Sequence, residues 1–326
     1  MAGEVTVELG DLRGYADVVD DVSRYLGRVS GYADTHCVTT DFGPMLDKLA
    51  DEYAALLPQM RQFLAEQVEL MEASALAIDR TLRDFRTTDA QEARRHGGRA
   101  TITDDGRSTA YHGNPMTELG SPSPDESELP EVDFGFPFDQ LAWALEKICG
   151  YDIRREVTDW LVGDVVEVSK QSNAWYMVGS AATSYSQWLQ NADIIVARTW
   201  TGDAATSTID RMEEWKETLD EQGTDFGQVG AHLADIAGDA VEVAQLVIDL
   251  IKFAVDLIAA AWASQWIPIY GQAKFAVKAW DAYHKVKEAW DKLQMFLDVL
   301  GLVVGYLKVL DDKLNPINLP AAPTHG

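Results

Sequence analysis

Side chains that could carry out catalytic or metal chemistry are few in this sequence, and their spacing does not suit either task. His36 stands beside Cys37, but a zinc site normally needs four ligands, and the six histidines are scattered. There is no glycine-rich phosphate loop and no Gly-x-Ser-x-Gly turn. Acidic pairs such as Asp20-Asp21 are most simply solvated helix surface. We therefore expect no enzyme activity, no metal site and no cofactor.

Two short motifs carry more information, and the first is Trp200-Thr201-Gly202, which lies between two long helical patterns. Glycine gives the backbone freedom at a tight turn. Thr201 or Asp203 is expected to cap the following helix through its side-chain oxygen. The ring of Trp200 is expected to wedge between the two helix ends, with its indole N–H bonded to a partner.

The second motif is Phe85-x-x-x-Asp89, at the end of another helical pattern. Residues four apart share one face of a helix, so the ring and the carboxylate are presented together to a docking receptor. The alternative is that Phe85 is simply the last apolar residue of the pattern and that Asp89 is a solvated charge.

The elements that position these motifs are helices with seven-residue apolar repeats, which predict coiled-coil-like packing. Residues 1–95 are expected to form a helical hairpin with a connection near Val38-Thr39-Thr40, a second helix starting at Pro44 and a kink at Pro58. The apolar positions of its first helix are Leu12, Tyr15, Val19, Val22, Leu26, Val29 and Ala33.

Residues 137–314 predict a second helical region. It begins with short helices at 138–149, ended by Gly150, and at 153–161. A long helix from about Asp164 runs into Trp200, and the return helix is expected to break at Gly223 or Gly227. A final helix ends at Asn315-Pro316.

Composition separates these regions. Residues 96–136 are rich in Gly, Ser, Pro, Asp and Glu and predict a disordered acidic linker, and residues 315–326 predict a flexible tail. The fold expected is all-α, an elongated antiparallel helical bundle built from two helical hairpin regions.

Charge and hydropathy limit the partners. The net charge of −26 disfavours nucleic acid and anionic membrane surfaces. The most hydrophobic run, 244–266, contains Asp249, Lys252 and Asp256 on one stripe, which favours a bundle helix over a membrane span. Cys37 and Cys149 are expected to be free thiols, although one disulfide between them remains an alternative. The N-terminus has no pattern typical of a cleavable signal peptide.

The order of hairpin, Phe-x-x-x-Asp, acidic linker and Trp-x-Gly helix pair resembles the WXG and PE–PPE-like substrates of type VII (ESX) secretion. The layout is similar to EspB-type substrates and the N-terminal hairpin to EspC-type proteins. The second half resembles the leader of actinobacterial WXG polymorphic toxins. The resemblance implies a secreted or surface protein whose composite export signal comprises Trp200, Gly202, Phe85 and Asp89, with Phe85 in place of the family's tyrosine.

This resemblance also implies partners: a secretion ATPase or chaperone of a type VII system, and a homo-oligomer or a WXG-family partner. We expect residues 85–89 to lie beside residues 200–202 in the folded chain. Two alternatives stay open. One is a cytoplasmic partner or leader that binds a separate WXG chain or toxin, and the other is a membrane-acting, pore-forming helical protein.

Overall fold

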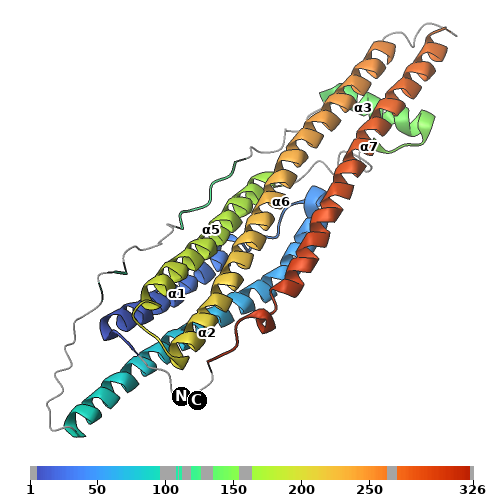
Figure 1. Cartoon of the computed structure of the whole chain (residues 1–326). Helices are drawn as coiled ribbons and strands as arrows, with labels where there is room; N and C mark the ends of the chain where they lie inside the picture. Colours follow the sequence, from blue (N-terminus) through green and yellow to red (C-terminus); the bar gives the residue numbers. More distant parts are fainter. Residues whose placement is uncertain are drawn as a thin grey trace.

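The computed structural model describes residues 6–95, 108, 110–111, 119–125, 135–153, 164–262 and 270–323. The described chain is all-α and elongated, with long helices packed antiparallel (Figure 1). The six α-helices are α1 (Leu9–His36), α2 (Asp47–Arg95), α3 (Gly135–Ala144), α5 (Val165–Val196), α6 (Asp203–Trp262) and α7 (Tyr270–Lys313). Short helical turns add η1 (Pro44–Leu46), η2 (Leu145–Cys149) and η4 (Pro316–Asn318).

The N-terminal hairpin forms as its apolar repeat predicts. All seven repeat residues of α1 are buried. The chain reverses after Cys37, whose carbonyl accepts a hydrogen bond of 2.7 Å from the hydroxyl of Tyr53 on α2. Gly43 has φ of 75° and precedes η1, which Pro44 starts. Helix α2 continues through Pro58, so Pro58 does not end the helix.

Helices α5 and α6 form the second antiparallel pair, and α6 differs from our expectation because it is one continuous helix of 60 residues. That corresponds to a length of about 90 Å. Gly223, one of the two predicted break points, serves close packing instead. An ideal Cβ on Gly223 would lie 2.2 Å from the hydroxyl of Thr183, and one on Gly179 would lie 2.8 Å from the Gly223 carbonyl. Only glycine lets the two backbones approach this closely.

Two apolar cores stabilise the molecule, and they do not follow the predicted division of the sequence. The larger core combines side chains of α1, α2, α5, the first part of α6 and the last part of α7. The smaller core combines α3, η2, the second part of α6 and the first part of α7. The two predicted helical regions therefore share the larger core.

The connecting segments pack more closely than their composition indicates. Much of the predicted linker 96–136 and of the predicted short helix 153–161 lies outside the described residues. Within the linker, Tyr111 is buried against Gly14, and the Asp125 amide donates to Ser169. The segment after α7, expected to be a flexible tail, contains η4 and the buried Leu319.

By length and composition, one described helix segment, Phe275–Lys313, could cross a membrane, and 39% of its most apolar window is buried inside the protein. This segment differs from residues 244–266, the most hydrophobic run of the sequence, which we interpreted as a bundle helix. The α6 part of that run is helical and contributes Ile251 and Ile258 to the smaller core, while residues 263–266 lie outside the described part.

Candidate functional site at the bundle tip

The turn between α5 and α6 reverses the chain at one end of the bundle, which we call the bundle tip. Helix α5 ends at Val196, whose carbonyl accepts a hydrogen bond of 2.9 Å from the Trp200 amide. Gly202 has φ of 109°, a conformation that side chains with a Cβ rarely adopt. Its carbonyl accepts the first helical hydrogen bond of α6, from the Thr206 amide at 3.0 Å.

This geometry corrects the predicted cap. Gly202 itself occupies the position before α6, and the hydroxyl of Thr201 turns to the N-terminal segment. The Thr201 and Thr6 hydroxyl oxygens lie 2.7 Å apart, and the Thr6 amide donates to the Thr201 hydroxyl at 3.2 Å. The side chain expected to cap the helix therefore joins two distant parts of the chain.

Residues 6–8 pair with the turn through their backbone. Val7 and Trp200 form an isolated antiparallel β-bridge. The Glu8 amide donates to the Thr199 carbonyl at 3.1 Å, and the Thr201 amide donates to the Thr6 carbonyl at 2.9 Å. The N-terminal segment thus covers the turn directly before α1 begins.

Trp200 lies inside the larger core, with 2% of its surface exposed. Its indole nitrogen is buried and has no hydrogen-bond partner among the described residues, contrary to our expectation. The ring therefore contributes through apolar packing, which stabilises the tip without a specific polar contact.

Helix α2 reaches the same end of the bundle, as its contacts with α6 show. Gln67 and Gln222 exchange side-chain hydrogen bonds of 2.7 and 3.2 Å. The Trp215 indole donates to Ser74 at 3.3 Å. Phe85 lies eleven residues beyond Ser74 on α2, and α6 begins twelve residues before Trp215. At about 1.5 Å per residue, this antiparallel register places Phe85 level with the start of α6.

Phe85 is partly buried against the larger core. Asp89 belongs to α2, but its side chain lies outside the described residues. Figure 1 shows α2 continuing past the α5–α6 turn, so its last turns project beyond the bundle tip. That residues 85–89 lie directly beside residues 200–202 stays a prediction.

A buried ionic cluster is centred on Asp193, about two helical turns before Trp200, and was missed by our sequence analysis. The Tyr15 hydroxyl donates to the Asp193 carboxylate at 2.5 Å, and Lys216 lies 2.8 Å from its other oxygen. Lys216 also pairs with Glu213. The cluster joins α1, α5 and α6. Its signal in the sequence is that Asp193 follows Leu189 by four residues and precedes Val196 by three, an apolar position of the repeat.

The electrostatics of this cluster follow from its burial. Desolvation raises the pKa of the Asp193 carboxyl, and hydrogen bonds from Lys216 and Tyr15 offset part of the increase. Burial and the charge of Asp193 together raise the pKa of Tyr15 well above its ordinary value. Because each charged group has an opposite partner within the cluster, its evident role is to fix the three helices near the tip.

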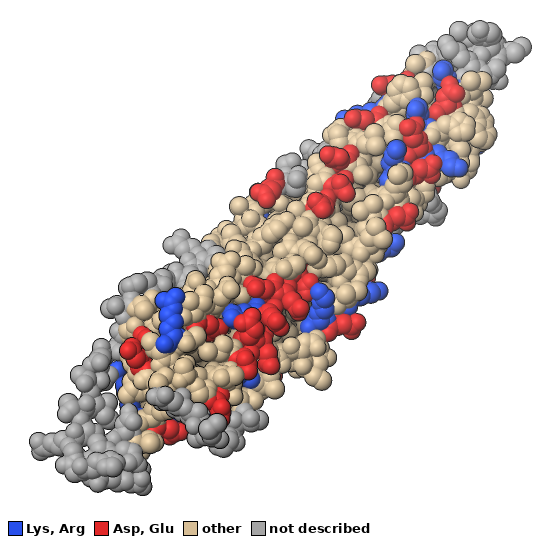
Figure 2. All heavy atoms as spheres, viewed as in Figure 1, with Lys and Arg blue, Asp and Glu red and all other residues tan. Residues whose placement is uncertain are grey.

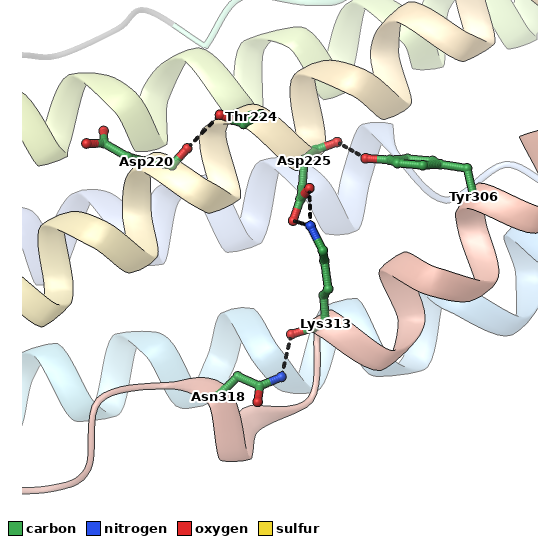
Figure 3. A network of polar contacts seen from close by, with 6 residues as sticks. All are labelled: Asp220, Thr224, Asp225, Tyr306, Lys313 and Asn318. Carbon is green, nitrogen blue, oxygen red and sulfur yellow. Dashed lines mark hydrogen bonds and ion pairs between the residues drawn. The ribbon is translucent and has the colours of Figure 1, made fainter.

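A second polar network closes the other side of the bundle between α6, the end of α7 and η4 (Figure 3). The ammonium of Lys313 contacts both carboxylate oxygens of Asp225, at 2.8 and 2.9 Å. The Tyr306 hydroxyl donates to the Asp225 backbone carbonyl at 3.1 Å. The side-chain amide of Asn318 donates to the Lys313 backbone carbonyl at 2.9 Å. Asp225, Lys313 and Asn318 border a cavity of about 340 Å³, which is also lined by Phe63, Thr218, Glu221, Gln222 and Leu314.

Lys313, the cation in the lining of this cavity, is already paired with Asp225. Within the described part of the chain, no three His, Cys, Asp or Glu side chains are grouped to hold a metal ion. Both cysteines are free thiols, in agreement with the interpretation favoured above.

Comparison with protein-family models, curated proteins and solved structures gave no significant match to this chain.

Proposed function

We propose that the protein is a substrate of a type VII secretion system that acts outside the cytoplasm as a non-enzymatic interaction protein. In this proposal Trp200 and Gly202, together with Phe85 and Asp89, form its export signal. The observation that carries the proposal is the Trp200–Gly202 turn, which reverses the chain between two long antiparallel helices. In the resembling families, a Trp-x-Gly turn of this kind lies at the tip of a helical hairpin.

The position of α2 supports the composite signal. Its register with α6 places Phe85 level with the start of α6, and its C-terminal end projects past the turn. A receptor that approaches this end of the bundle meets the end of α2 and the α5–α6 turn together. The end of α2 would supply the side-chain recognition, while the buried Trp200 and the backbone of Gly202 set the shape of the turn.

Export of Trp200→Ala from the native host tests the proposal. We expect the wild-type protein in cell-free medium only when the secretion ATPase is present, and we expect the variant to remain in the cells. Trp280→Ala is the matched control, because Trp280 is a half-exposed tryptophan on α7 outside the tip. Circular dichroism should show equal helicity for all three proteins.

Phe85→Tyr provides a test with the opposite sign. It restores the hydroxyl that the family's signal has, so export should equal or exceed that of the wild type. Normal amounts of folded Trp200→Ala in the medium, or wild-type export without the ATPase, would contradict the proposed signal.

A further inference from the structure

Helix α7 carries two apolar seven-residue repeats on different faces, and only one of them is buried along its whole length. The inner repeat is buried against α2 and α6 and consists of Leu293, Phe296, Leu300, Val303, Leu307, Leu310 and Leu314. The other, which we call the outer seam, consists of Met295, Val299, Leu302, Tyr306 and Val309. Its spacing of four, three, four and three residues is that of a coiled-coil interface.

The outer seam is exposed to an extent unusual for large apolar side chains. Leu302 is 75% exposed, Met295 60% and Val309 56%. Tyr306 is partly buried and is held by its hydroxyl, which bonds to Asp225 (Figure 3). Figure 2 shows a largely uncharged stretch of surface midway along the molecule, over α6 and α7. A row of large exposed apolar side chains such as the outer seam marks an interaction site.

Space beside the seam allows a helix to approach closely. Gly301 and Gly305 lie on the exposed side of α7, and an ideal Cβ on either would meet no atom within 4 Å. The seven-residue period of the seam also matches a helix specifically, because knobs-into-holes packing needs that repeat. A lipid surface would not require it.

Charges beside the seam indicate what kind of helix fits. One position of the seven-residue repeat, directly next to the seam, is occupied by Asp291, Asp298 and Asp312. Gly305 occupies the same position between Asp298 and Asp312. All three carboxylates are exposed, and none has a cation partner in the described part of the chain. Lys308 and Lys313 are nearby, but they pair with Glu52 and Asp225.

A second copy of this chain does not satisfy this acidic row. In an antiparallel pair of α7 helices, the row would face the same row of the other copy, so like charges would repel. In a parallel pair it would face the positions of Phe296, Val303 and Leu310, which are buried inside each copy. An anionic membrane is repelled as well, because the chain has a net charge of −26.

We propose that the outer seam binds an amphipathic helix of a separate protein, one with an apolar seven-residue repeat and with Lys or Arg next to it. The apolar side chains would pack between Met295 and Val309, and the basic side chains would pair with the Asp291, Asp298 and Asp312 row. This inference does not rest on the export proposal, since it concerns a different surface.

The test is titration of the purified full chain with two synthetic helices of about four heptads. Both carry Leu and Ile at the apolar positions, and they differ only in having Lys or Glu at the flanking positions. We expect the Lys-flanked helix to bind at least about tenfold more tightly than the Glu-flanked helix. Its affinity should fall as salt is raised, because the pairing charges are exposed.

Two variants make the result specific to the outer seam. Leu302→Asp should abolish binding, whereas Leu76→Asp, which places the same charge at an exposed leucine of α2, should leave it unchanged. Asp298→Lys combined with Asp312→Lys should reverse the preference in favour of the Glu-flanked helix. Circular dichroism confirms that each variant is folded.

Three outcomes would overturn the proposal. The first is equal affinity for the two helices, and the second is binding that survives Leu302→Asp. The third is occupation of the seam by something else, seen as a dimer in analytical ultracentrifugation or as flotation with anionic or zwitterionic vesicles, in either case lost in Leu302→Asp. Loss of export in Trp200→Ala, or its retention, bears on none of these results.

Discussion

The backbone of Val7 is paired with the backbone of Trp200 in an antiparallel bridge, although the two residues lie far apart in the sequence. The hydroxyls of Thr6 and Thr201, 195 residues apart, meet beside this bridge. The first described residues of the chain, 6–8, are therefore hydrogen-bonded to the α5–α6 turn.

Removal of residues 1–8 should loosen this turn without unfolding the bundle. The Thr201 amide would lose its acceptor, the Thr6 carbonyl, so its hydrogen exchange should become markedly faster. Amides in the middle of α5 and α6 should keep their protection, because the buried residues of the larger core begin at Leu12, after the removed segment. Unchanged exchange at Thr201 would mean that the N-terminal segment does not hold the turn in solution.

Gly202→Ala should destabilise the protein by about 1–2 kcal/mol, because φ of 109° is unfavourable for a residue with a Cβ. Urea denaturation measures this loss. The control is Gly31→Ala on α1, where a Cβ meets no neighbouring atom and the helix favours alanine. The free energy of unfolding of Gly31→Ala should increase by about 0.5–1 kcal/mol. A similar increase for Gly202→Ala would contradict the positive φ of Gly202 in the folded protein.

Lys216→Met should cost about 3–5 kcal/mol near neutral pH, because it leaves the buried Asp193 carboxylate without its cation. Burial already raises the pKa of Asp193 in the folded state above its unfolded value of 3.8. The ionised Asp193 carboxylate therefore destabilises the folded variant at pH values above its folded-state pKa. This destabilisation disappears as the pH falls below the unfolded-state pKa of Asp193. Denaturation curves across this range should show the deficit of the variant shrinking on acidification.

Adding Asp193→Asn to Lys216→Met gives the control for that pH dependence. The double variant has no carboxylate at this position, so it should recover part of the lost stability at neutral pH. The difference between the two variants should vanish at low pH. A deficit of Lys216→Met that is constant with pH would show that Asp193 is not the group responsible.

The two thiols should react at very different rates in the native protein. Cys37 is fully buried, and desolvation raises its pKa, so both access and thiolate formation are suppressed. Cys149 is only partly buried and should be modified first by a maleimide. Mass spectrometry after short labelling, with and without urea, distinguishes the sites. Rapid native labelling of Cys37 would be inconsistent with its place in the core.

The helices, and with them the fold class, followed from the sequence because seven-residue apolar repeats are a local property. The repeat predicted α1, and all seven residues of that repeat are buried. Pro44, Gly150 and Asn315-Pro316 predicted where elements begin or end. Gly202 as the residue that allows the α5–α6 turn could likewise be predicted, because its conformational freedom is intrinsic.

Contacts between distant segments could not be predicted in this way. The same residue types that end a helix in isolation can serve close packing when another helix lies against them, as Gly223 does against α5. The pairing of Val7 with Trp200 and the burial of Tyr111 depend on which surfaces the folded bundle leaves next to each segment.

For the candidate site, the sequence by itself determined the residue types at the tip and the direction change at Gly202. Only the tertiary structure decided that α2 reaches the same end, that Asp193 and Lys216 pair beneath the turn, and that one repeat of α7 stays uncovered. The reason is physical: periodicity specifies that a helix face will be buried or paired, but the partner is chosen by packing and charge across the whole fold.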